Sequence, residues 1–151
     1  ENAFSHGSTF APNELAMAAG LATLRELDEQ GLVESSATLG ERLLELTRPL
    51  AERHDVVREV RGLGLMWAIE FCEPPTRRRS YRIVERLQHG LFAQLVVVPL
   101  FREHRVLSQV AGHGIPVVKG LPPLVVTEEQ LDEGVAALDA ALAIADAKVE
   151  G

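Results

Sequence analysis

The stretch Asp55–Phe71, DVVREVRGLGLMWAIEF, decides the fold class of this chain. It contains two β-rich runs, which Gly62 separates. The apolar residues of the second run recur at every other position and therefore share one face of a strand: Leu65, Trp67, Ile69 and Phe71. We expect the two runs to form an antiparallel strand pair.

Two helices are predicted before this pair. The first spans residues 13 to about 30, where Asn13 is a suitable N-cap and Gly31 follows the last turn. Its richness in alanine indicates close packing. The second spans about 35–53 and repeats leucine at helical spacing, and Pro49 is expected to kink it or to mark its last turns.

The residues after the pair predict a helix, broken strands and a final helix. A short helix is expected at about 80–89, and the apolar runs 94–100 and 115–126 are typical of strands interrupted by prolines. Thr127 opens a capping box before a long periodic run. The sequence therefore predicts an α+β fold: two N-terminal helices, then a small, mostly antiparallel sheet packed with helices.

The amino-acid composition of the chain excludes several classes of function. The chain has 151 residues, of which 46% are hydrophobic and 25% are charged, as in a soluble globular domain. Its net charge of −7 argues against nucleic acid as a partner, and no apolar run is long enough to span a membrane. Cys72 is the only cysteine, which excludes an internal disulfide and fits the cytoplasm, and the histidines show no metal-ligand spacing.

The segment HGSTFAPN, residues 6–13, places small residues and two hydroxyls directly before the first helix. Hydroxyls and backbone N–H groups next to a helix start suit a phosphate group. Because the chain starts without Met, we expect it to be a piece of a longer protein. Composition and periodicity alone indicate no more than an α+β domain.

Three motifs in order carry a resemblance to a known family: HGSTFAPNELAMAAGLATL, EVRGLGLMWAIEF and VVKGLPPLVVTEEQLDEGVAAL. Together they resemble the C-terminal part of the class III aminotransferases, which are pyridoxal-phosphate enzymes of fold type I. The resemblance runs from about Phe4 to Leu142. It implies that residues 1–31 hold the end of a large domain, with a phosphate-contact loop and a helix. Residues 32–151 would then form the small C-terminal domain with its leading interdomain helix.

The resemblance also implies roles for individual residues. Ser8 and Thr9 would bind the phosphate of pyridoxal 5′-phosphate held by the neighbouring subunit of a homodimer; alternatively, they only cap the turn before Asn13. Lys119 stands where many relatives carry an arginine that clamps a substrate carboxylate, so it is a candidate substrate-binding residue. A lysine is a point charge without the guanidinium fork, and Lys119 could instead be an exposed charge at a strand end.

The segment RGLGL, residues 61–65, is similar to another family motif. We expect its glycines to serve a tight turn or a close backbone approach between two strands, in preference to ligand binding. Arg61 is expected to be held by a buried ion pair.

The Schiff-base lysine of the family lies upstream of the HGST loop, whereas this chain has only Lys119 and Lys148, both downstream. No catalytic residue is therefore expected here, and the chain alone should not transaminate. The complete enzyme would transfer an amino group between an amine or amino acid and a 2-oxo acid. One alternative is a non-catalytic domain used for dimerisation or for docking in a larger synthase. Another is a related cofactor chemistry, such as that of an aminomutase or a decarboxylase.

Overall fold

The β1–β2 hairpin forms where the alternating pattern predicts it. The computed structural model describes residues 13–73, 78–87, 90–112 and 114–149. Strand β1 (Val57–Leu63) pairs antiparallel with β2 (Met66–Phe71), and a bulge interrupts the register near the start of β1. The structure separates into two units, residues 1–34 and 35–151. The predicted division at residues 31 and 32 stays a prediction.

The first unit contains helix α1 (Glu14–Glu29), as predicted. The Asn13 side chain accepts a hydrogen bond from the Ala16 N–H at 2.9 Å, so Asn13 is the N-cap. No residue of α1 is buried, although close packing was expected from its alanines. Its exposed apolar side chains include Leu15, Met17, Leu21 and Leu24.

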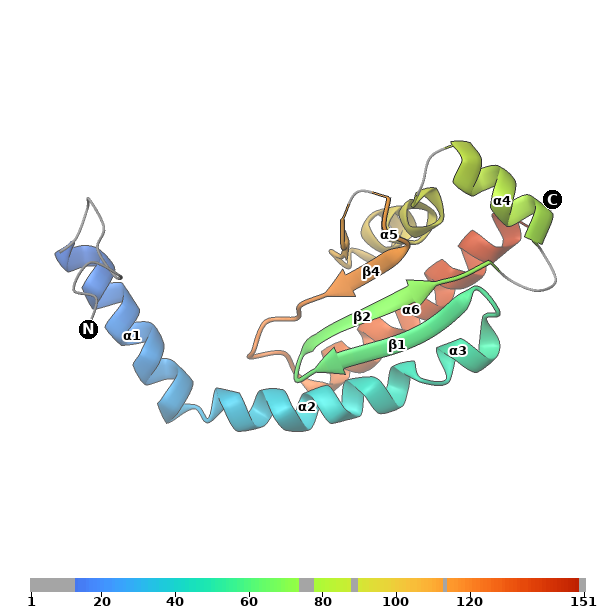
Figure 1. Cartoon of the computed structure of the whole chain (residues 1–151). Coiled ribbons are helices and arrows are strands. Elements are labelled where there is room, and N and C mark those ends of the chain that lie inside the picture. The colour runs from blue at the N-terminus through green and yellow to red at the C-terminus, as the bar shows by residue number, and fades with distance from the viewer. Residues whose placement is uncertain (1–12, 74–77, 88–89, 113, 150–151) are drawn as a thin grey trace, which may run out of the picture. The chain divides into compact units, whose positions relative to one another are not determined.

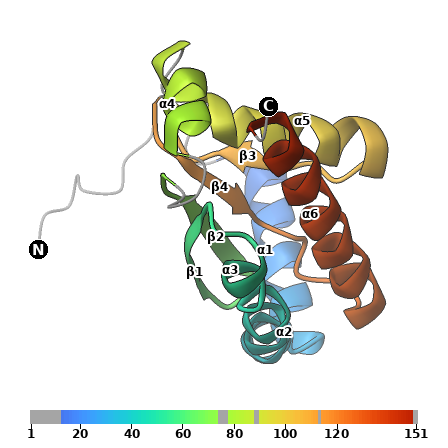
Figure 2. The same ribbon diagram turned by 90° about the vertical axis from the view of Figure 1, so that its right-hand side faces the viewer.

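The sheet of the second unit has four antiparallel strands within the described residues, in the order β1-β2-β4-β3. Strand β4 (Val117–Gly120) lies between β2 and β3 (Gln109–Val110). Helices α5 (Leu91–His104) and α6 (Glu128–Val149) pack together against one face of this sheet (Figures 1 and 2). This arrangement confirms the predicted α+β fold.

The predicted second helix is divided in two. Helix α2 (Leu32–Thr47) ends just before Pro49, and α3 (Leu50–Arg53) is a single short turn after it. Pro49 thus marks the break, as expected. Helix α4 (Arg78–Leu87) matches the predicted short helix, and the capping box at the start of α6 is formed by reciprocal hydrogen bonds of Thr127 and Gln130.

The strand predicted at residues 94–100 is wrong, because these residues lie inside α5. A short apolar run of β-branched residues does not by itself distinguish a strand from a buried helix. The helical period becomes visible only when the run is extended toward its start, since the buried residues are Phe92, Ala93, Val96, Pro99 and Leu100. The second broken strand, at 115–126, is confirmed only over the four residues of β4.

The core lies between the sheet and the two helices α5 and α6. Phe92 is fully buried at its centre, with the ring of Phe71 at 5.1 Å and that of Tyr81 at 5.3 Å between centroids. From the sheet, Ile69 and Val118 are fully buried in the same cluster. One face of the sheet therefore packs on the core, and the opposite face can make other contacts.

Candidate functional site

The face of the sheet opposite the core carries a row of paired residues. Arg61 of β1 is paired with Ala68 of β2, Ala68 with Lys119 of β4, and Lys119 with Gln109 of β3. Directly paired residues point to the same side of a sheet, and side chains alternate along each strand. The neighbours of this row, Ile69 and Val118, point into the core, so the row lies on the other side, which we call the outer face.

Lys119 therefore lies within the sheet, and it is half-buried. Among the residues that the structure describes, none forms a hydrogen bond or ion pair with its ammonium group. A partly buried cation without a partner keeps its capacity to bind an anion. The structure thus places Lys119 in a position from which it could contact a carboxylate.

Arg61 forms an ion pair at the outer face, but the pair is not buried. Its Nη1 lies 2.8 Å from one carboxylate oxygen of Glu70, and Arg58 Nη1 lies 2.9 Å from the other. The Arg61 side chain is 46% exposed, so the expectation of a buried pair is wrong. The hydrogen bonds from Arg61 and Arg58 lower the pKa of Glu70 below its ordinary value. Two guanidinium groups hold this carboxylate, and it makes no contact with Lys119.

Gly64 forms the tight turn of the hairpin, as expected, and its backbone also lies close to helix α2, which the sequence did not predict. Gly64 has a φ of 55°, which a residue with a Cβ rarely adopts. A Cβ added to Gly40 of α2 would lie 2.3 Å from the Gly64 carbonyl carbon. The Leu65 N–H also donates to the Ser36 hydroxyl at 3.3 Å. The turn is therefore seated on α2, which fixes the end of the hairpin.

A buried histidine links α3 to α6. The Nδ1 of His54 lies 2.8 Å from Asp146, its Nε2 lies 2.8 Å from Asp139, and Arg53 also contacts Asp139. Both ring nitrogens of His54 therefore contact carboxylate groups of α6. Within the described ranges, no group of three or more ligand-type side chains could hold a metal ion. We interpret this cluster as a structural contact.

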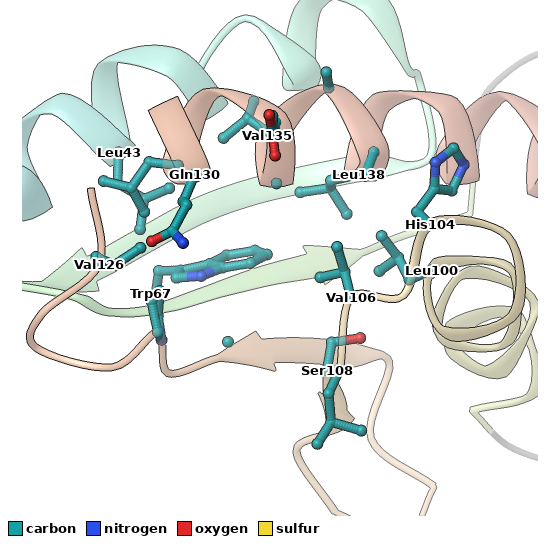
Figure 3. Close-up of a pocket in the computed structure, with 18 of the residues that line it drawn as sticks. Leu43, Trp67, Leu100, His104, Val106, Ser108, Val126, Gln130, Val135 and Leu138 are labelled. Carbon is teal, nitrogen blue, oxygen red and sulfur yellow. The ribbon is translucent and has the colours of Figure 1, made fainter. Parts of the chain in front are cut away.

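A pocket of about 920 Å³ lies on the core side of the sheet, between α6, the end of α5 and the loop after β4. Trp67 and Gln130 lie at one end and His104 at the other (Figure 3). The lining is mostly apolar, and Lys119 does not contribute to it. The pocket and the outer face are thus separate features, and the sequence did not indicate the pocket.

The predicted phosphate ligands Ser8 and Thr9 lie outside the described residues. The part of the HGST region that can be described is the start of α1, where Asn13 already occupies the Ala16 N–H and Glu14 adds a negative charge. A helix end that is capped and acidic attracts an anion less than a free one.

The class III aminotransferase family model matches residues 1–142. The chain belongs to this family.

Curated relatives agree with this assignment. The chain is 37% identical over 134 residues to acetylornithine aminotransferase of Caldanaerobacter subterraneus, covering 89% of this chain and 29% of that protein. It is 34% identical over 139 residues to the [LysW]-aminoadipate semialdehyde transaminase of Deinococcus radiodurans, covering 91% and 27%. The chain thus spans less than a third of the length of these relatives.

Solved structures share the fold. A thermostable 6-fold mutant of an omega transaminase from Pseudomonas jessenii superposes with a TM-score of 0.81 at 25% identity, covering 97% of this chain and 30% of that one. An S-selective transaminase from an Arthrobacter species, with alanine bound, superposes with a TM-score of 0.75 at 26% identity, covering 92% of this chain and 30% of that one.

In the described part of the chain, no helix has both the length and the apolar character needed to cross a membrane.

Proposed function

We propose that the complete protein is a pyridoxal-phosphate-dependent aminotransferase that moves an amino group between an amine or amino acid and a 2-oxo acid. Within this chain, the proposal rests on Lys119. It is a half-buried cation on the outer face of the sheet, and no described residue neutralises it. Its ammonium group would bind the carboxylate of the 2-oxo acid, and the domain would form one wall of the substrate site.

The cofactor, when bound, would withdraw electrons from the carbon that exchanges the amino group. Ser8 and Thr9 would donate hydrogen bonds to its phosphate across the interface of a homodimer. The lysine that carries the cofactor would lie in the rest of the protein, so the 151-residue chain alone is expected to be inactive. Cys72, as the only cysteine, is compatible with the reducing cytoplasm, which we propose as the location.

The first experiment compares the complete protein with the 151-residue chain after incubation with pyridoxal phosphate and dialysis. We expect a retained cofactor absorbance band and transfer of amino groups to a 2-oxo acid in the complete protein only. A complete protein that neither retains the cofactor nor transaminates would refute the proposal and favour a non-catalytic domain used for dimerisation or docking.

The role of the loop is tested with Thr9→Ala in the complete protein. We expect weaker cofactor binding by about 1.5–3 kcal/mol, the usual worth of a hydrogen bond to a charged group. Thr23→Ala is a matched control, because the Thr23 hydroxyl donates to the Ala19 carbonyl at an exposed position of α1. Equal cofactor affinity of the two variants would remove Thr9 from the phosphate site.

Dimer formation is tested by sedimentation of the complete protein. The exposed apolar side chains of α1 need cover from another surface, which supports a homodimer. A mass of one subunit at high protein concentration would contradict this part of the proposal.

A further inference from the structure

Gln109 is the immediate neighbour of Lys119 on the outer face. The two residues are direct partners in the β3–β4 register. Such pairs place their Cβ atoms about 4.5–5.5 Å apart on the same face of the sheet. The residues flanking Gln109 confirm its direction, because Ser108 is buried and Val110 packs against the core while Gln109 is exposed.

The donor groups of this pair are both available. Neither the Gln109 side chain nor the Lys119 side chain forms a hydrogen bond or ion pair with another described residue. On the far side of Lys119 the row continues with Ala68, which has no polar side-chain group. Glu70, the nearby acid on the outer face, is held by two arginines. An anion that binds Lys119 can therefore reach Gln109 without displacing an existing contact.

A carboxylate has two oxygens and accepts more than one hydrogen bond. An arginine supplies two parallel N–H donors from one side chain, whereas a lysine supplies a single point of charge. The amide N–H groups of a glutamine on the next strand would add hydrogen-bond donors at a second position. Glutamine is neutral and adds no repulsion between like charges beside the ammonium group.

We infer that Gln109 is a specificity-determining residue that donates a hydrogen bond to the same substrate carboxylate as Lys119. This inference rests on the proposed function. Lys119 and Gln109, on two neighbouring strands, together make the contacts with the carboxylate that a single guanidinium group would make. Lys119 provides the charge, and Gln109 fixes the orientation of the carboxylate. Loss of Gln109 therefore weakens the binding of substrates that carry this carboxylate and leaves the binding of other substrates unchanged.

The test uses the complete enzyme with three acceptors. Pyruvate has a carboxylate next to the reacting carbonyl, succinic semialdehyde has one at the far end, and butanal has none. Gln109→Met keeps the length of the side chain but removes its N–H donors. We expect the KM of pyruvate or of succinic semialdehyde to rise at least about tenfold, while that of butanal stays unchanged. The acceptor that responds identifies which carboxylate the pair binds.

Gln109→Glu sharpens the test, because a glutamate would pair with Lys119 and repel the substrate. We expect a larger rise in KM for the same acceptor than with Gln109→Met. Unchanged butanal kinetics in both variants show that the protein remains folded. Equal effects on all three acceptors, or no effect on any, would overturn the inference.

Lys119→Met separates this inference from the proposed function. If Lys119→Met raises the KM of a carboxylate acceptor and the Gln109 variants do not, only the inference fails. If the unaltered protein transaminates but Lys119→Met has no effect, the proposed role of Lys119 fails and the inference fails with it. A complete protein without any transaminase activity overturns both.

Discussion

Replacement of Gly40 by alanine tests whether the hairpin turn is seated on α2. The added Cβ would lie 2.3 Å from the Gly64 carbonyl carbon and from its oxygen. Carbon atoms in contact normally stand about 3.5 Å apart, so the two backbones must separate by roughly 1.2 Å. The atoms in conflict belong to the backbone and cannot turn aside as a side chain could. A shift of α2 would also loosen the cluster that Leu43 and Leu65 form with Leu131.

Overpacking of this kind costs about 3 kcal/mol at the upper end of its usual range. The better helix propensity of alanine offsets about 1 kcal/mol of this cost. The free energy of unfolding of Gly40→Ala should therefore be lower by about 2 kcal/mol. With a typical dependence of about 2 kcal/mol per molar urea, the unfolding midpoint followed by circular dichroism should fall by about 1 M.

Gly134→Ala is the matched control, because Gly134 lies within α6 and nothing stands within 4 Å of its added Cβ. It should raise the free energy of unfolding by about 1 kcal/mol through helix propensity alone. The two variants should thus shift the midpoint in opposite directions. A Gly40→Ala protein as stable as the unaltered chain would show that α2 and the hairpin turn are not in contact, and the reasoning would fail.

Three further variants test other contacts. Phe92→Ala removes the ring between Phe71 and Tyr81 and should lower the free energy of unfolding by about 3–5 kcal/mol, measured by urea titration. Thr127→Ala removes the capping box of α6 and should cost about 1 kcal/mol in the same assay, and no change would mean that the cap is not formed in solution. The pKa of Glu70 is lower in the folded protein than its ordinary value of 4.5. Ionised Glu70 therefore stabilises the fold when the pH is above 4.5, and this stabilisation is lost as the pH falls through the lower pKa of the folded state. Glu70→Gln should therefore lose less stability than the unaltered chain when the pH is lowered into this acidic range, and parallel pH profiles would contradict the predicted linkage.

Most elements of the fold follow from local signals in the sequence. The capped helix at Asn13, the break at Pro49, the alternating hairpin and the capping box at Thr127 each depend on a few neighbouring residues, and the structure contains all of them. Residues 94–100 were misassigned because their burial on the sheet outweighs the β propensity of three consecutive valines. Strand β3 has only two residues, so no periodic pattern could reveal it.

The candidate site was predictable only in part. Lys119 was identified by its place in a family motif, and the structure adds that it is half-buried and lies on the outer face. The pairing with Gln109 depends on register between two strands separated by a loop, which a single sequence does not specify. The partner of Arg61 was likewise hidden, although Glu70 is only nine positions away, because the hairpin brings the two together.

The two edges of the sheet bear on how the chain can aggregate. An exposed edge strand can pair with another chain, and proteins limit this by short edges and by charged residues. Here one edge is β3, with two residues, and the other is β1, which carries Arg58, Glu59 and Arg61. Neither edge offers a long apolar template for strand addition, so association of the chain should proceed through helix packing and leave its β-sheet content unchanged.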